Sequence, residues 1–521
     1  MNDSTTAEIS ISTAVVESST SRKRPAQDLD ASSGSTLTSA NDRPTKLAKQ
    51  QNVKVPAMFL PKSARPPQAF KWLPALALPA HQPQILSGQP LAPLGPATCL
   101  HGVHLEPKAS PKVALFDLDD TLITRKSGKK FSDDPTDWKL WTENVGERLK
   151  KAAADGFAIV VVTNQAGLPV KGREEKWKTK IPMIAESAFK DIPFRVFAAK
   201  EKDGFRKPML GMWDALVQQF KQESVTIDKS ASFMVGDAAG RIRPKDFSAA
   251  DRKLAENIGL KFYTPEEFFK GQKVELPPLD GFHPSKQKFS DSLPALISTS
   301  ASPEVVLFVG PPGCGKSTIF KRHFASAGYV HVNQDTLGSK PKCVKEVDRV
   351  LSQHGKCVVD NTNRDKAARA EYIAIAKKHG AGVRCVHFDV PIELAWHNNM
   401  YRAFHMRVEG VSPTVINSLA TTTTTTLTPT VEDSDEEDTK SKGKKTKKKT
   451  TIKSTTITAS TATKSPAPRS LVPWIAYTTF RSKFEAPEQS EGFQEVIKIG
   501  FVYEGNGEEE QARWNTWMEL N

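Results

Sequence analysis

One stretch of this sequence constrains the fold more than any other. An apolar run, Glu304–Val309, leads directly into Gly310–Ser317, which has the pattern Gly-x-x-x-x-Gly-Lys-Ser. A glycine-rich turn between a strand and a helix points backbone N–H groups at phosphate oxygens. The pattern therefore predicts a parallel α/β sheet that binds a nucleoside triphosphate at this turn. The alternative is a chance glycine turn, and the strand before it argues against that reading.

The same turn predicts individual roles. Lys316 would reach the β- and γ-phosphates of ATP, and the Ser317 hydroxyl would hold Mg²⁺. The residues expected to contact the nucleotide are Gly310, Gly313, Cys314, Gly315, Lys316, Ser317 and Thr318. ATP and Mg²⁺ are accordingly the cofactors that we expect.

Three later residues could complete a phosphoryl-transfer site. Asp335 follows a short predicted strand and could take a proton from an acceptor hydroxyl. Asp360 ends another apolar run, where an acid near the metal is expected. Arg402 could close over ATP and stabilise the migrating phosphoryl group. Each has a simpler reading, as a helix cap or a surface charge, and His397 beside them is expected to be structural.

A second site is predicted in the first half of the chain. Asp117 and Asp119 lie two residues apart at the end of an apolar run, so their side chains project the same way. Open parallel sheets bind ligands beyond the carboxyl ends of their strands. One aspartate there can attack phosphorus and the other can transfer protons, with Mg²⁺ holding phosphate beside the two carboxylates. This spacing predicts removal of a phosphate.

Supporting residues follow in order along the chain. Thr163 and Asn164 end the next predicted strand and would bind the substrate phosphate. Lys207 would neutralise developing charge, and Asp237, at a third strand end, would complete a metal shell with Asp117 and Asp119. Each is weak alone, but the ordered set is specific. Two further acids, Asp246 and Asp251, could be structural or could support the metal.

Composition and patterning predict two α/β domains with unfolded segments around them. The chain has 521 residues, of which 38% are hydrophobic, and a formal net charge of +14, which suits a polyanionic partner. The five cysteines are scattered, which is typical of reduced intracellular thiols. No apolar run is long enough to span a bilayer.

The predicted boundaries follow changes in composition. They are a disordered tail at 1–65, a lead-in at 66–100 with Phe70 and Trp72 as packing anchors, a first domain at 101–272, a linker at 273–300 and a second domain at 301–521. A low-complexity insertion, 419–468, interrupts the second domain and carries acids and then lysines. Its lysines could touch nucleic acid or form a neutral tether.

Several elements are predicted within the two domains. The expected strands are Val113–Leu118, Ala158–Thr163, Ser232–Gly236, Lys356–Asp360, Arg384–Phe388 and Val496–Phe501, besides the run before the glycine turn. The expected helices are Trp138–Ala153 and Pro208–Phe220. The tail holds two basic clusters, Arg22–Pro25 and Arg43 with Lys46 and Lys49. They indicate nuclear import or an auxiliary nucleic-acid contact, and a solvated tail is the alternative.

The acidic set resembles motifs one to four of the haloacid dehalogenase-like phosphatase superfamily. That resemblance implies that Asp117 is the nucleophile, Asp119 the acid/base and Asp237 a metal ligand, with the Asp119 carbonyl also reaching the metal. Both halves together resemble the polynucleotide kinase 3′-phosphatase family, over roughly 101–272 and 303–503. The most specific marks are Gly236–Arg241, Lys245–Ser248, Thr264–Phe269, Asp335–Ser339, Asp360–Asn363, His397–Asn399 and Lys483–Pro487.

The resemblance implies a phosphatase followed by a kinase, with Asp335 activating a 5′-hydroxyl. Three departures stand out. Asp120 occupies a position where the family often has glycine, and Gln334 replaces a frequent arginine beside the kinase base. Residues 1–100 do not show the pattern of a forkhead-associated domain, so we expect the fungal type of the family.

The resulting hypothesis is a monomeric nuclear enzyme that prepares DNA breaks for ligation. It would hydrolyse 3′-phosphates and phosphorylate 5′-hydroxyls with ATP, and repair factors could bind its tail or insertion. Three rivals remain: RNA end-healing by the same chemistry, a metabolite kinase fused to a small-molecule phosphatase, and a catalytically dead scaffold. The set of intact acidic and basic site residues argues against the scaffold.

Overall fold

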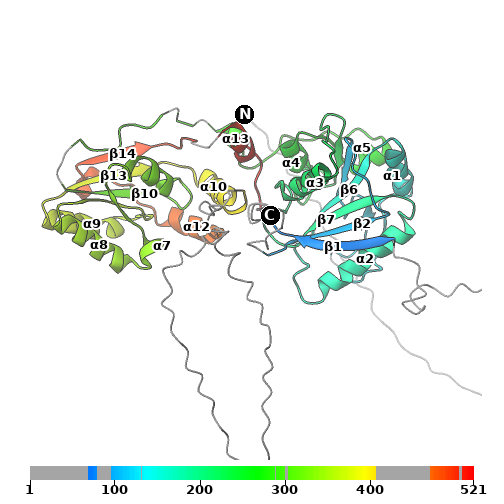
Figure 1. The fold of residues 1–521 in the computed structure, drawn as a ribbon, viewed down its shortest axis with the longest axis horizontal. Coiled ribbons are helices and arrows are strands. Elements are labelled where there is room, and N and C mark those ends of the chain that lie inside the picture. Colours follow the sequence, from blue (N-terminus) through cyan, green and yellow to red (C-terminus); the bar gives the residue numbers. More distant parts are fainter. Residues whose placement is uncertain are drawn as a thin grey trace, which may run out of the picture. The chain divides into compact units, whose positions relative to one another are not determined.

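A computed structural model gives the fold of the chain (Figure 1). It describes residues 69–78, 96–130, 132–287, 289–290, 292–299, 303–405, 470–503 and 507–520. The predicted tail with its basic clusters, and the predicted insertion at 419–468, lie outside the described residues. The described chain forms two α/β parts, each built on its own sheet.

The first sheet has seven strands in the order β1-β2-β7-β6-β3-β8-β9. Their bounds are β1 Phe70–Leu76, β2 Cys99–His104, β3 Val113–Phe116, β6 Ala158–Asn164, β7 Phe194–Ala199, β8 Phe233–Val235 and β9 Lys261–Tyr263. The five strands from β7 to β9 are parallel, whereas β2 and β1 are added antiparallel at one edge. A small two-stranded sheet joins β4 Ile123–Thr124 to β5 Lys139–Leu140.

Helices cover both faces of the first sheet. They are α1 Val145–Ala154, α2 Arg173–Ser187, α3 Gly211–Gln222, α4 Ala250–Ile258 and α5 Pro265–Lys270. Successive residues of β3 alternate between the two faces. Ala114 and Phe116 pack in the core that contains α1 and α2, whereas Val113 and Leu115 pack with α3 and α4. The apolar run of β3 is therefore buried on both faces, as expected of a central parallel strand.

Two segments of the first part differ from the sequence-based prediction. The helix expected from Trp138 begins at Val145, because Lys139–Leu140 pairs with β4 and the Trp141 N–H donates to the Leu122 carbonyl. The lead-in contributes strand β1 to the sheet, although its proline-rich composition did not predict a strand. Its anchors do pack: Phe70 is buried, and the Trp72 ring lies 5.6 Å from that of Trp177.

The second sheet has five parallel strands in the order β11-β12-β10-β13-β14. Their bounds are β10 Glu304–Val309, β11 Val330–Val332, β12 Lys356–Val359, β13 Gly382–Phe388 and β14 Glu495–Ile499. The helices are α6 Lys316–Ile319, α7 Gln334–Leu337, α8 Lys340–Ser352, α9 Lys366–Lys378, α10 Ile392–Phe404, α12 Trp474–Ser482 and α13 Glu508–Trp514. The predicted strands of this part are thus present, with bounds shifted by one or two residues.

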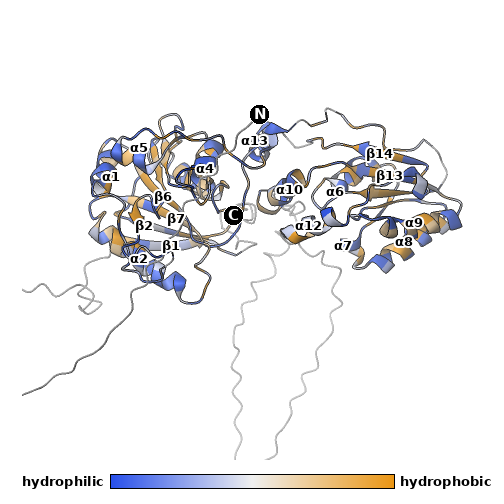
Figure 2. Ribbon diagram, turned by 180° about the vertical axis from the view of Figure 1, so that it is seen from behind, coloured by the Kyte–Doolittle hydropathy of each residue, from blue (hydrophilic) through white to orange (hydrophobic). Residues whose placement is uncertain are grey.

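The second sheet is also covered on both faces. Val305 and Leu307 of β10 pack in a core with α8 and α9, whereas Val306 and Phe308 pack with α10 and Phe324. Figure 2 shows hydrophobic residues concentrated in strands such as β6 and β13, with helices that mix hydrophilic and hydrophobic segments. All five cysteines are buried and free. Among the described residues, no helix combines the length and apolarity that a membrane span requires.

Candidate active sites

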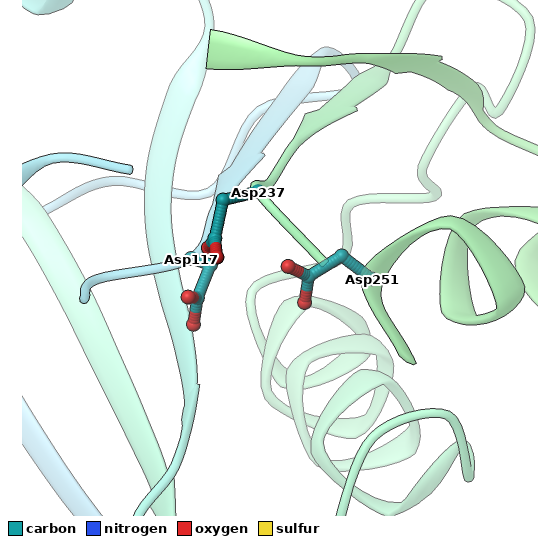
Figure 3. A group of neighbouring side chains, drawn as sticks. All are labelled: Asp117, Asp237 and Asp251. Carbon is teal, nitrogen blue, oxygen red and sulfur yellow. The ribbon is translucent and has the colours of Figure 1, made fainter. Parts of the chain in front are cut away.

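Three carboxylates meet at the carboxyl edge of the first sheet. Asp117 directly follows β3, Asp237 follows the neighbouring strand β8, and Asp251 lies in the first turn of α4. One oxygen from each carboxylate lies within 4.8 Å of the others (Figure 3). The sequence predicted the first two members of this group and left the role of Asp251 open.

Lys207 connects two of these acids. Its ammonium nitrogen lies 2.5 Å from Asp117 Oδ1 and 2.7 Å from Asp251 Oδ1, and it donates to the Val162 carbonyl at 2.9 Å. The lysine is only 4% exposed. Although burial lowers it, the charges of Asp117 and Asp251 raise the pKa of Lys207 above its usual value. Lys207 is therefore a fixed positive charge beside the predicted nucleophile.

Burial and mutual repulsion disfavour full ionisation of the acids. Burial raises the pKa of Asp117 to about 7, with Lys207 opposing the rise and Asp251 adding to it. Burial, followed by the charges of Asp117 and Asp251, raises the pKa of Asp237 to about 9. A single lysine does not offset three carboxylates at this spacing, two of them buried and Asp237 half-buried. This all-oxygen donor set fits a hard divalent cation such as Mg²⁺, which would remove the repulsion.

Asp119 lies outside this group of three acids. Its Oδ2 accepts a hydrogen bond from Gln165 Nε2 at 2.7 Å, and Lys180 Nζ lies 3.9 Å from its Oδ1. Its side chain is 33% exposed, whereas Asp117 is largely buried. Asp251, whose role the sequence left open, is the third carboxylate of this group, and the acid/base role of Asp119 stays a prediction.

Thr163 and Asn164, the two residues predicted to bind the substrate phosphate, make different contacts in the structure. The Thr163 hydroxyl is buried at the end of β6 and accepts from Gln165 Nε2 at 3.0 Å. Asn164 instead uses its side-chain amide on the Lys207 backbone, donating to its carbonyl at 3.1 Å and accepting its N–H at 2.9 Å. The Asn164 side chain therefore positions Lys207, a role that the sequence did not indicate.

Two positions near these acids, Gly236 and Asp120, have backbone or packing geometry that favours glycine. A Cβ at position 236 would collide with the Asp251 carboxylate, so glycine is needed for the close approach of α4. Asp120 has a left-handed φ of 56°, a backbone conformation that favours glycine. Its carboxylate accepts from the Thr124 hydroxyl at 2.7 Å and lies 3.8 Å from Arg125.

The second site surrounds the glycine-rich turn after β10. Gly313 and Gly315 have left-handed φ values of 76° and 101°, and a Cβ on Gly313 would meet the Ala395 carbonyl. The Lys316 ammonium group lies across the turn and donates to the Gly310 and Pro311 carbonyls at 3.1 and 2.7 Å. Helix α6 starts at Lys316, as a phosphate-binding turn requires.

Ser317 and Asp360 are joined directly. The Ser317 hydroxyl donates to Asp360 Oδ2 at 2.6 Å, and His331 Nε2 lies 2.9 Å from the same oxygen. Although burial acts to raise it, His331 and the charge of Lys316 hold the pKa of Asp360 below its usual value. This ionised acid beside a hydroxyl is a suitable oxygen pair for a metal bound to nucleotide.

A cavity of about 620 Å³ brings the predicted kinase residues together. Its lining includes Lys316, Ser317, Asp335, Asp360 and Arg402. Asp335 lies in α7, where its backbone N–H is capped by Asn333 and its side chain is exposed.

Two basic or aromatic side chains of α10 have different surroundings. Arg402 donates to Asn399 Oδ1 at 3.1 Å through Nη2. His397 is buried, it does not line the cavity, and its Nε2 lies 2.8 Å from the Trp514 carbonyl. Burial lowers its pKa to about 4, so the imidazole is neutral near pH 7.

The sequence analysis left the role of Asp251 open and assigned no role to His331 or Gln165. Asp251 and His331 contact site residues across long loops, so spacing along the chain carries no signal for them. Gln165 follows Thr163 and Asn164 by one or two positions, and a polar run at a strand end was an available signal.

Comparisons with known proteins agree with this geometry. Residues 112–269 match the family model described as polynucleotide kinase 3 phosphatase, and residues 305–418 match an AAA domain. A bifunctional polynucleotide phosphatase/kinase of Schizosaccharomyces pombe is 40% identical over 314 residues, which cover 60% of this chain and 75% of that protein. The chain belongs to the bifunctional polynucleotide phosphatase/kinase family.

Other members and relatives of the family resemble one or both parts. A putative bifunctional polynucleotide phosphatase/kinase of Acanthamoeba polyphaga mimivirus is 35% identical, covering 58% of this chain and 78% of that protein. A polynucleotide 3′-phosphatase of Saccharomyces cerevisiae is 29% identical, covering 30% of this chain and 87% of that protein. The family's order, phosphatase before kinase, is kept in this chain.

Proposed function

We propose that this chain repairs the two kinds of blocked terminus at a broken DNA strand. Its first part removes a 3′-phosphate, and its second part transfers the γ-phosphate of ATP to a 5′-hydroxyl. The observation that carries the proposal is the coexistence of a strand-end acid group with a buried lysine and a P-loop cavity with a potential base. Similarity to a bifunctional relative across 75% of that relative's length supports both activities.

In the phosphatase reaction, the Asp117 carboxylate attacks phosphorus and forms an aspartyl-phosphate. Lys207 lies 2.5 Å from that carboxylate and balances negative charge as the bond forms. Asp119 donates a proton to the leaving 3′-oxygen and then accepts one from the water that cleaves the aspartyl-phosphate. Its partly exposed position allows it to reach both substrate and water.

In the kinase reaction, the P-loop N–H groups and Lys316 hold the ATP phosphates. Asp335 accepts the proton of the 5′-hydroxyl as its oxygen attacks the γ-phosphorus, and ADP leaves. Arg402 lines the same cavity and stabilises charge on the phosphoryl group in flight. Asp360 and Ser317 are the oxygen ligands for a cation on the nucleotide.

Mg²⁺ is the cation that we propose for both sites. In the first site, Asp117, Asp237 and Asp251 would hold it, together with the backbone of Asp119. When bound, it supplies positive charge that draws a phosphate dianion toward neighbouring carboxylates. ATP and Mg²⁺ are thus the expected cofactors.

An end-labelling assay tests the proposal. The substrate is a nicked duplex that carries a 3′-phosphate and a 5′-hydroxyl, incubated with Mg²⁺, with or without ATP. Loss of the 3′-phosphate should not need ATP, whereas gain of a 5′-phosphate should need it. A wild-type protein that leaves both termini unchanged would overturn the proposal. A matched RNA substrate separates DNA repair from RNA end-healing, since faster turnover on RNA would favour the latter.

We also propose that the protein acts as a monomer in the nucleus. The basic cluster Arg22–Arg24 would carry the import signal, and the substrate itself resides there. A fluorescent fusion of the full chain should concentrate in nuclei, and alanines at the three basic positions should disperse it. Light scattering of the purified protein measures its mass in solution.

A further inference from the structure

A loop beside the phosphatase acids presents apolar side chains to solvent. This loop, the 241–248 loop, runs from Arg241 to Ser248 between β8 and α4. Phe247 is 88% exposed and Ile242 is 68% exposed. Among the described residues, no other large hydrophobic side chain is as exposed as Phe247. Two apolar side chains exposed on one loop offer contact area to a ligand, and the surroundings of the loop indicate which kind of ligand it suits.

The base of the 241–248 loop is held firmly. Arg241 Nε donates to Asp246 Oδ1 at 2.8 Å, and its Nη1 donates to Glu266 Oε1 at 2.9 Å. The Gly240 N–H donates to the Ser248 carbonyl at 3.2 Å, which closes the loop at its ends. Ile242 and Lys245 pair, so the tip of the loop is the turn at Arg243–Pro244, and Phe247 lies beside Ser248 in the fixed base with its ring exposed.

The loop is also connected to the predicted metal site. Arg241 Nη2 donates to the backbone carbonyl of Asp237 at 3.0 Å. Asp237 in turn belongs to the group of three acids. Ile242 follows Asp237 by five residues and Phe247 follows it by ten, so a strand whose 3′ end is in the site would lie near this loop.

The charges of the loop favour a polyanion. Arg243 and Lys245 lie at or next to the tip and are exposed, and among the described residues neither has an ion-pair partner. The one acid of the loop, Asp246, is already paired with Arg241. Exposed basic side chains interleaved with an aromatic ring are the combination that binds single-stranded nucleic acid, through phosphate contacts and base stacking.

We infer that the 241–248 loop binds the polynucleotide strand whose 3′-phosphate enters the phosphatase site. Phe247 stacks on a nucleobase near the 3′ end, Ile242 extends the apolar contact, and Arg243 and Lys245 contact backbone phosphates. This inference rests on the proposed 3′-phosphatase function and adds residues that grip the strand.

Steady-state kinetics on a 3′-phosphorylated single-stranded oligonucleotide tests the stacking contact. Phe247→Ala should raise KM roughly 5- to 100-fold and leave kcat unchanged, because stacking on one base is lost while the acids stay in place. Phe247→Trp should restore KM, since it supplies another aromatic face. Ile475→Ala removes a 70% exposed apolar side chain from α12 and is the matched control, with no effect on phosphatase KM.

The kcat and KM of the variants separate the outcomes. An unchanged KM in Phe247→Ala, with active wild-type enzyme, overturns the inference and leaves the proposed function intact. A fall in kcat with unchanged KM also overturns it, because the ring would then support the site itself. If the wild type fails to hydrolyse the oligonucleotide, the proposed function fails as well. If the loop instead binds a protein partner, Phe247→Ala should leave KM unchanged.

The salt dependence of KM tests the phosphate contacts independently. In the double variant Arg243→Gln/Lys245→Gln, the slope of log(1/KM) against log[salt] should become shallower by about 0.7 for each lost contact. The 5′-kinase activity of the same protein is the internal control and should keep its wild-type salt response. If the slope of log(1/KM) against log[salt] for the phosphatase is unchanged, neither Arg243 nor Lys245 contacts the strand.

Discussion

The Lys207 ammonium nitrogen lies 2.5 Å from Asp117 Oδ1, and both residues are buried. This contact stabilises the ionised form of the carboxylate, which burial alone would disfavour. The same nitrogen contacts Asp251 at 2.7 Å, so one cation serves a nucleophile and a helix-borne acid. The phosphatase site is therefore an electrostatic unit of one lysine and three acids.

Asp117→Asn should abolish 3′-phosphatase activity and spare the kinase. The amide cannot form the aspartyl-phosphate, and removal of a nucleophile lowers kcat by roughly 10³- to 10⁶-fold. The measurement is release of phosphate from a 3′-phosphorylated oligonucleotide, with 5′-end labelling of a second oligonucleotide as the control. Loss of both activities in folded protein would contradict the assignment of one activity to each part.

Lys316→Ala should have the reverse effect. Without the ammonium group, the ATP phosphates lose their main positive contact in the glycine-rich turn, so ATP binding and phosphoryl transfer fall together. Phosphatase turnover on the same preparation should stay at the wild-type rate. A kinase that retained full activity would show that another residue carries this charge.

Asp335→Ala should separate ATP binding from transfer. Loss of the general base should lower the kinase kcat by about 10²- to 10⁴-fold, while ATP affinity stays near that of the wild type. Fluorescent-nucleotide titration measures binding, and 5′-end labelling measures transfer. The exposed side chain makes misfolding an inadequate explanation for such a split. Equal losses in binding and transfer would instead assign Asp335 to the nucleotide.

Asp251→Asn should weaken Mg²⁺ use by the phosphatase. The asparagine can still accept the Ala238 N–H that Asp251 Oδ2 accepts at 3.0 Å, but it removes one anionic oxygen donor. We expect the Mg²⁺ concentration for half-maximal phosphatase rate to rise about 10- to 100-fold. Asp246→Asn is the comparison, because Asp246 pairs with Arg241 outside the group of three acids. Identical Mg²⁺ curves for wild type and Asp251→Asn would exclude Asp251 as a ligand.

Mg²⁺ should stabilise the protein more strongly as pH rises. The folded-state pKa values of Asp117 and Asp237, about 7 and about 9, lie above the usual value for aspartate, so the fold holds protons there that the unfolded chain releases. In EDTA, their contribution to stability is fully present below the unfolded pKa and falls as pH rises above it, until the loss is complete near pH 7 for Asp117 and near pH 9 for Asp237. The loss is at most about 1.4 kcal/mol per pH unit for each proton.

Thermal unfolding at several pH values, with EDTA or with Mg²⁺, measures this effect. Because the cation must displace these protons, the Mg²⁺-induced rise in Tm should grow between pH 6 and pH 9. Asp237→Asn removes the group with the higher pKa and should flatten the EDTA profile in that range. A Mg²⁺ effect that is equal at all pH values would contradict the raised pKa values.

The sequence predicted which residues at strand ends reach the phosphatase site. It did not predict which residues reach that site from helices or loops. Asp117, Thr163 and Asp237 follow apolar runs, and parallel strands bring such ends to one edge. Asp251 reaches the same place from α4, a path that depends on the length and course of a loop. Periodicity carries no information about that approach.

Contacts between distant segments also determine the edge of the first sheet, and local sequence patterns do not predict them. β1 lies in a proline-containing segment, and its pairing with β2 depends on residues more than twenty positions away. The start of α1 was misplaced because Lys139–Leu140 is taken up by pairing with β4, a tertiary contact that overrides helical patterning. In the kinase part, the strand before the P-loop was predicted to the residue, since its apolar run is bounded by glycine.

Each group of reactive side chains lies at the carboxyl edge of its own sheet. A genetic consequence follows for a cell that carries this protein. Point alleles at either edge should separate into two complementation classes, and two such damaged copies in one cell should together restore processing of broken ends.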